Sequence, residues 1–110
     1  MEAKEAAAAW ELGVRSGPII QDRAVQYPAI GTIMEWAQTR IANGEDPQVV
    51  SQDIVTKLRE HADAYRDVAI SVMERARSRF QMKDEDFAEP LNVSRATVAN
   101  LRKRVPGTEV

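Results

Sequence analysis

The feature that most constrains the fold is the long segment from Gln48 to Phe80, which contains neither proline nor glycine and keeps one helical period. Asp46 and Pro47 precede it, and they suit the N-cap and the first turn of a helix. Within the stretch, apolar residues recur at three- and four-residue spacing, which is the period of one helix face. They are Val50, Ile54, Leu58, Tyr65, Val68, Val72 or Met73, Ala76 and Phe80, with His61 between two of them.

An unbroken helix over these roughly 34 residues would span about 50 Å, which is too long for a compact monomer of this size. The chain has 110 residues, enough for one domain with a modest core. Either the helix breaks, near residues 60–65, or its apolar face is covered by another chain. We expect a long central helix that holds a homodimer. A coiled coil is not favoured, because Arg75 and Arg79 take positions that heptads fill with apolar residues.

The segments before this stretch also favour helices. Residues 2–12 are strong helix formers that end at Gly13, and either a docked helix or a frayed terminus fits them. A connector with two prolines and two glycines follows, and the pair Tyr27-Pro28 predicts a boundary there. The next helix is amphipathic and ends at Asn43-Gly44. Its apolar positions are Ile30, Ile33, Met34, Ala37 and Ile41.

The composition limits the core and the classes of function. Aromatic residues make up only 5%, so Trp10 and Trp36 are expected to anchor the core, with exposed partner contacts as the alternative. Cysteine is absent and histidine occurs once, so neither a disulfide scaffold nor a metal site is expected. No glycine-rich phosphate loop, G-x-S-x-G sequence or aligned carboxylate pair is present. We expect no catalytic residues, no cofactor and no enzymatic activity.

Charge is unevenly distributed along the chain. Residues 74–104 hold eight Lys or Arg and five Asp or Glu, whereas the rest holds seven basic and twelve acidic residues. The acids of this window cluster in KDEDFAE, which leaves two basic segments, ERARSRF and SRATVANLRKR. A nucleic-acid footprint is local in this way, because only the face near phosphate needs positive potential. The sequence shows neither a membrane-spanning apolar run nor a secretory leader, which favours a cytoplasmic protein and no membrane partner.

The stretch FAEPLNVSRATVANLRKR, residues 87–104, predicts two short helices that pack across a tight turn. Apolar residues of the first helix are Phe87, Ala88 and Leu91, and those of the second are Val98, Leu101 and Val105. Asn92 suits a left-handed turn and Ser94 suits the N-cap of the second helix. The free face of that helix carries Ser94, Arg95, Ala96, Ala99, Asn100 and Lys103. Small polar, amide and cationic groups are what base edges and phosphates require.

This stretch resembles the helix-turn-helix motif of bacterial DNA-binding transcriptional regulators. The resemblance is carried by Ala88 in the first helix, Val93-Ser94 after the turn, Thr97-Val98, and Leu101. Two positions depart from the family pattern. Asn92 stands where the family usually has glycine, and Pro90 is expected to kink or shorten the first helix.

The resemblance implies that the helix from Ser94 to Arg104 enters the major groove. Arg95 would contact guanine, Asn100 adenine, and Thr97 a phosphate or a thymine methyl group. The expected DNA-binding residues are Ser94, Arg95, Ala96, Thr97, Asn100, Lys103 and Arg104, of which Ser94, Lys103 and Arg104 would contact phosphate. Arg75 and Arg79 are candidates for secondary phosphate contacts, although a solvated helix end is the commoner explanation of such residues.

We therefore expect an all-α fold, a small helical domain with a long central helix and a C-terminal helix-turn-helix. Residues 1–83 would form the scaffold and dimerisation region, and residues 84–110 the DNA-binding element. The expected function is that of a dimeric transcriptional regulator that binds double-stranded DNA in the cytoplasm, on the nucleoid. The alternatives are a phage or plasmid protein for DNA packaging or partition, and an antitoxin-like or anti-activator module that binds a protein partner.

Overall fold

The computed structural model describes residues 2–61 and 66–104, and every regular element in these two ranges is helical. The expected all-α class is confirmed. The elements are α1 Ala3–Trp10, a π-helical turn η1 Glu11–Arg15, α2 Pro18–Gln26, α3 Pro28–Ala42, α4 Pro47–His61, α5 Arg66–Phe80, a 3-10 turn η3 Asp84–Phe87, α6 Ala88–Leu91 and α7 Arg95–Arg104.

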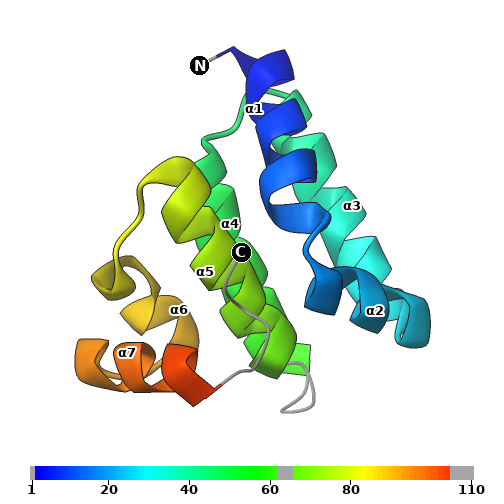
Figure 1. Cartoon of the computed structure of the whole chain (residues 1–110). Helices are drawn as coiled ribbons and strands as arrows, with labels where there is room; N and C mark the ends of the chain where they lie inside the picture. Colours follow the sequence, from blue (N-terminus) through cyan, green and yellow to red (C-terminus); the bar gives the residue numbers. More distant parts are fainter. Residues whose placement is uncertain (1, 62–65, 105–110) are drawn as a thin grey trace.

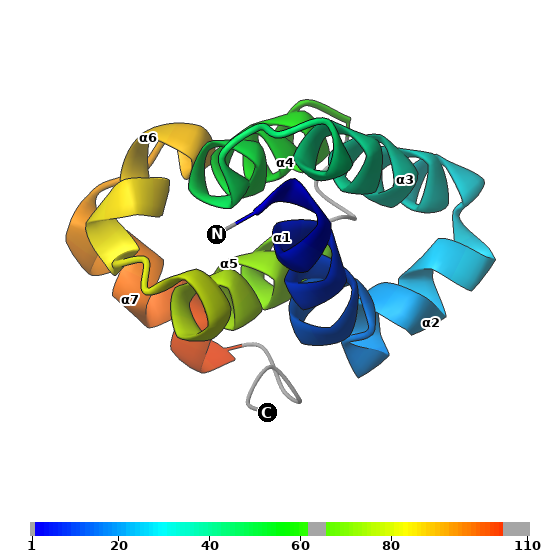
Figure 2. The ribbon, with the colours of Figure 1, turned by 90° about the horizontal axis from the view of Figure 1, so that it is seen from above.

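Four helical segments form a bundle that carries most of the core. The first segment, α1 with η1, packs on α3, α3 packs on α4, and α4 packs on α5. The ring closes because η1 also packs on α5, while α2 lies at one end against α3 and α5. The α4–α5 pair separates α1, α2 and α3 from η3, α6 and α7 (Figure 1, Figure 2). The C-terminal elements thus rest on one side of the bundle.

The expectation of one long central helix is wrong. α4 ends at His61 and α5 begins at Arg66, and the two helices pack against each other. Residues 62–65, including Tyr65, lie outside the described residues. The apolar stripe is buried within the one chain, since Val50, Ile54 and Leu58 of α4 and Val68, Val72 and Met73 of α5 are all fully buried. The face on which a homodimer was expected is therefore covered by the chain itself.

The N-terminal segment is docked rather than frayed. Trp10 is fully buried and its ring stacks on Phe80, with 6.4 Å between the ring centroids. Gly13 does not end the helix, which continues through the π-helical turn to Arg15. Trp10 thus anchors the core as expected.

The boundaries of α3 agree with the sequence. Tyr27 is extended, with φ −127° and ψ 96°, and α3 begins at Pro28. The helix ends at Ala42, and Gly44 has a positive φ of 99° that few residues other than glycine adopt. The five apolar positions expected to face the core, Ile30, Ile33, Met34, Ala37 and Ile41, are all buried. Trp36 is not among them, because its side chain lies on the outer face and is 38% exposed.

The C-terminal elements share the core of the bundle. Phe87, at the end of η3, and Val98, in α7, are fully buried in the same apolar cluster as the residues of α3, α4 and α5. Met82, just before η3, belongs to it too. The expected division at residues 83 and 84 coincides with the start of η3, but packing continues across it. Residues 105–110 of the expected DNA-binding element lie outside the described residues.

Candidate nucleic-acid interface

The first helix of the C-terminal pair is short, as Pro90 predicted. It consists of the 3-10 turn η3 and the four residues of α6, and Pro90 is buried. The backbone N–H of Lys83 donates to the carboxylate of Asp86 over 2.8 Å, which caps the start of η3. The 3-10 turn therefore replaces the first turn of a longer α-helix.

The turn between the two helices is built on Asn92. Its φ of 59° and ψ of 44° place it in the left-handed region. The N–H of Asn92 donates to the carbonyl of Glu89, and that of Val93 donates to the carbonyl of Ala88, both over 2.9 Å. This pair of hydrogen bonds satisfies carbonyls at the end of α6 and reverses the chain. Asn92 thus adopts the left-handed conformation that glycine usually provides at the end of a helix.

Ser94 caps the N-terminus of α7. Its Oγ accepts a hydrogen bond from the backbone N–H of Thr97 over 3.2 Å, and the two hydroxyl oxygens lie 2.9 Å apart. A serine cap of this kind satisfies one of the N–H groups that lack partners in the first turn. Ser94 is an exposed residue as well. The position of the cap is therefore confirmed.

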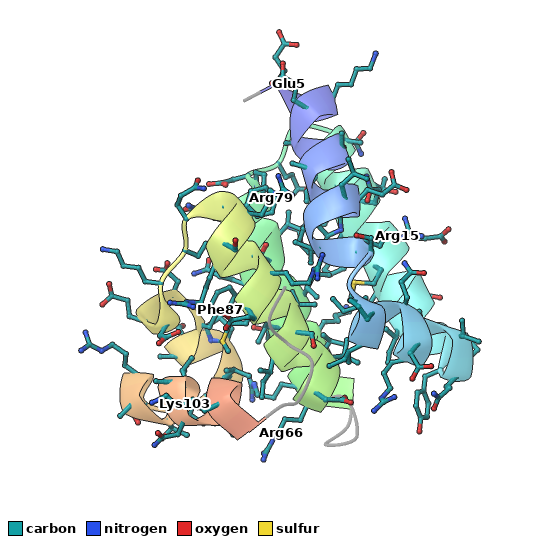
Figure 3. All side chains as sticks on the ribbon, in the orientation of Figure 1. Glu5, Arg15, Arg66, Arg79, Phe87 and Lys103 are labelled. Atoms are coloured by element: carbon teal, nitrogen blue, oxygen red, sulfur yellow. The ribbon has the colours of Figure 1, made fainter. Side chains whose placement is uncertain are left out.

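α7 has one buried face and one open face. Val98 is fully buried, and Leu101 and Val93 are half-buried against the core. The open face brings together most of the expected residues, with Ser94, Arg95, Ala96, Asn100 and Lys103 exposed and Thr97 half-buried. The side chain of Arg104 lies outside the described part of the structure. α7 lies at the edge of the molecule and carries the exposed Lys103 (Figure 3).

Two side chains of α4 fix the position of this unit. The Nε of Arg59 donates to the carbonyl oxygen of Pro90 over 2.7 Å, and the Nε2 of Gln52 donates to that of Asp86 over 2.8 Å. Both acceptors belong to the short η3–α6 segment. The orientation of α7 is thus set by the bundle and not by the turn alone. The sequence gives no sign of these contacts, because a polar side chain on a helix surface does not reveal a backbone partner about 30 residues away.

Acidic residues flank the N-terminal end of α7. The guanidinium of Arg95 lies 4.0 Å from the carboxylate of Glu85, and both side chains are exposed, at 75% and 53%. Asp84 is 3.0 Å from the Nε of Arg77. An open depression of about 420 Å³ lies between these groups; it is lined by Arg77, Lys83, Asp84, Glu85, Arg95, Ala96 and Ala99. Residues 83–89 hold one basic and four acidic residues, so most of the positive charge near the motif is carried by α7.

Arg75 and Arg79 do not extend the surface of α7. The Nε of Arg75 donates to the carbonyl oxygen of Gly13 over 2.7 Å, and burial, with the charge of Arg79 as a second cause, lowers the pKa of Arg75. Arg79 packs over Gly13, where a Cβ would clash with it. Figure 3 places Arg79 beside the first helix, far from Lys103. Arg75 serves the packing of η1 on α5.

Comparison of the chain with protein-family models, with curated proteins and with solved structures finds no match. The structure itself adds two observations, both of which concern residues 2–61 and 66–104. No helix there is long and apolar enough to cross a membrane. In the same ranges, no three His, Asp or Glu side chains gather in a way that would hold a metal ion.

Proposed function

We propose that this protein binds double-stranded DNA with α7 in the major groove and acts as a transcriptional regulator. The observation that carries the proposal is the open face of α7. Ser94 caps this helix and Val98 packs it on the core, while exposed polar and cationic groups line its outer side. A helix of 10 residues is about 15 Å long, and the major groove, about 12 Å wide, admits an α-helix.

The roles of the side chains follow from their positions on α7. Arg95 is in the first turn, where its planar fork suits the O6 and N7 acceptors of guanine. Asn100 is one and a half turns further on and offers the donor and acceptor that adenine requires. Lys103, near the other end, and Ser94, at the cap, suit phosphate contacts that set the register. Thr97 is half-buried and bonded to Ser94, so it suits a phosphate or a thymine methyl group.

The sequence of α7 contains four basic residues and no acidic one, which supports attraction to phosphate. Glu85 opposes this attraction at one end. A carboxylate beside the reading helix lowers affinity for any DNA backbone, so contacts to bases must supply a larger share of the binding.

We also propose that the protein is a dimer and that it binds DNA in the cytoplasm. Two copies related by a two-fold axis would address half-sites about 34 Å apart. The dimer surface is not the α4–α5 stripe, because that stripe is buried within the chain. A phage or plasmid protein that marks DNA for packaging or partition would use the same contacts.

A protein-interaction module is the second candidate, and a specific observation favours it. Glu85, Asp86 and Glu89 line an open depression of about 400 Å³ beside α6, together with Asp53 and Arg59. In helix-turn-helix proteins the first helix of the pair crosses the DNA backbone, and carboxylates on it would repel phosphate. A basic protein partner would instead be attracted.

The test is binding to random duplex DNA, measured by fluorescence anisotropy at several salt concentrations. We expect affinity to fall steeply as salt rises, and Lys103→Ala to weaken binding and make the salt dependence shallower. Lys4→Ala is the matched control, since Lys4 is an exposed cation on α1. After selection of a preferred sequence, Arg95→Ala should lose about 1–3 kcal/mol of discrimination at one base pair. Absence of binding at low salt would refute the proposal.

A further inference from the structure

A tryptophan on the surface of the bundle marks a second candidate site. Trp36 lies on the outer face of α3 and is 38% exposed, whereas Trp10 is fully buried. Beside it, between α3 and α4, is an open and mostly apolar depression of about 420 Å³; it is lined by Ala29, Thr32, Ile33, Trp36 and Lys57. We call this depression the Trp36 groove.

The cationic side chains of Arg40 and Lys57 lie over the indole ring of Trp36. The guanidinium carbon of Arg40 lies 4.8 Å from the ring centroid, and the Nζ of Lys57 lies 4.9 Å from it. At this distance a cation is attracted to the face of an indole. Both contacts favour this orientation of the ring, which would lower the ordering cost of binding.

The two cations differ in what they can offer a partner. Arg40 is already paired with Glu45, at 2.6 Å, and with Asp53, at 2.8 Å. Lys57 is exposed, and no carboxylate among the described residues forms an ion pair with it. The groove thus combines an apolar lining, an exposed aromatic ring and one uncompensated positive charge.

We propose that the Trp36 groove docks a segment of a partner protein in which an apolar side chain stands beside an aspartate or glutamate. The apolar side chain would cover Trp36 and Ile33, and the carboxylate would pair with Lys57. Tryptophan at such positions supplies much of the energy of protein interfaces. The positive charge of Lys57 thus favours a partner segment that carries a carboxylate.

The surroundings of the groove disfavour the other occupants. A nucleic-acid strand brings a continuous line of phosphates, whereas the lining of the groove offers one cation, Lys57, and is otherwise uncharged. A small molecule binds best where most of its surface is buried, and this depression is open. A single carboxylate on an apolar segment avoids both difficulties.

The site is separate from α7 and does not depend on the function proposed for it. α3 lies on one side of the α4–α5 pair and α7 on the other (Figure 2). A partner at Trp36 and a ligand at α7 would therefore not compete for space.

The test is selection of a phage-displayed random-peptide library against the full chain, with a parallel selection against Trp36→Ala. We expect peptides that carry an apolar residue beside Asp or Glu and that are not enriched on Trp36→Ala. A synthetic peptide from this set should change the fluorescence of the exposed Trp36. Lys57→Glu should weaken its binding about tenfold, and a peptide with its acidic residue changed to Lys should bind Lys57→Glu better than it binds the native chain.

Lys4→Glu is the control for charge reversal, and circular dichroism checks that each variant is folded. Enrichment of basic peptides, enrichment that Trp36→Ala does not alter, or no enrichment at all would overturn the proposal. So would a concentration-dependent dimer in sedimentation that Trp36→Ala dissociates, because the occupant would then be a second copy of the chain.

Discussion

The side chain of Arg59 donates a hydrogen bond from Nε to the carbonyl oxygen of Pro90 over 2.7 Å. The carbonyls of Ala88 and Glu89 are satisfied by the turn, so Pro90 needs a partner from elsewhere. α4 supplies it. Because α7 follows this turn directly, the contact also helps to set the direction in which α7 projects.

Replacing Arg59 by methionine should destabilise the C-terminal unit. The substitution keeps much of the apolar stem but leaves the Pro90 carbonyl without its donor, at a cost of about 1 kcal/mol. Urea denaturation measures the change in the free energy of unfolding. Lys4→Met, which removes an exposed cation from α1, should cause almost none. If Arg59→Met were as stable as Lys4→Met, water would satisfy the Pro90 carbonyl as well as Arg59 does.

Arg75→Met should destabilise the packing of η1 on α5 without changing the affinity for DNA. The Gly13 carbonyl would lose a charged donor that now lies at 2.7 Å, and such bonds contribute about 1.5–3 kcal/mol. The measurements are thermal unfolding and binding to random duplex DNA. A variant that keeps its stability but binds DNA less tightly would restore Arg75 as a phosphate contact.

The sequence predicted α7 well because its signals are local. Ser94, Val98 and Leu101 stand at the spacing of a capped helix with one apolar side, and the structure buries and exposes them accordingly. Pro90 acts on its own helix, so its effect could be read directly. The same locality made Asn92 recognisable as a turn residue.

Long-range relationships were not predictable in this way. The length of the stretch allowed a break near residues 60–65, but no proline or glycine marks it and the helical period continues in phase, so the sequence did not decide between a break and a dimer. Trp36 looked like a core residue because hydrophobicity alone does not show which face of α3 meets the bundle. Its flanking cations come from α3 and α4, so only the packed helices bring Lys57 to the ring.

Substitutions at Asn92 should change the free energy of unfolding according to how easily the new residue adopts a positive φ. Asn92→Ala places an ordinary side chain at φ 59° and should lower the free energy of unfolding by about 1 kcal/mol. Asn92→Gly removes the steric cost and should match or exceed the native stability. Urea denaturation of both variants decides the matter. A loss of stability in the glycine variant equal to that in the alanine variant would mean that the amide side chain, not the turn, matters.

Ser94 combines two roles that substitutions can separate. Ser94→Ala removes the acceptor of the Thr97 N–H and should cost about 1 kcal/mol of stability. Ser94→Asp keeps a capping oxygen and should preserve stability, yet it places a negative charge where phosphate is proposed to bind. DNA anisotropy should therefore show a greater loss for Ser94→Asp than for Ser94→Ala. The reverse order would remove Ser94 from the proposed interface.

Glu85→Gln should increase affinity for DNA if α7 binds in the proposed way. Its carboxylate lies 4.0 Å from the Arg95 guanidinium and competes with any phosphate or base that approaches. Both groups are exposed, so the change in stability should stay within about 0.5 kcal/mol.

The gain should be several-fold at low salt and smaller at high salt, because screening weakens the repulsion between Glu85 and the DNA backbone. Glu5→Gln is the matched control, since Glu5 lies on α1 at the opposite end of the molecule from Lys103 (Figure 3). An equal rise in both variants would reflect net charge alone. A rise confined to Glu85→Gln would locate the bound DNA beside Arg95, and no rise would point to the protein-interaction alternative.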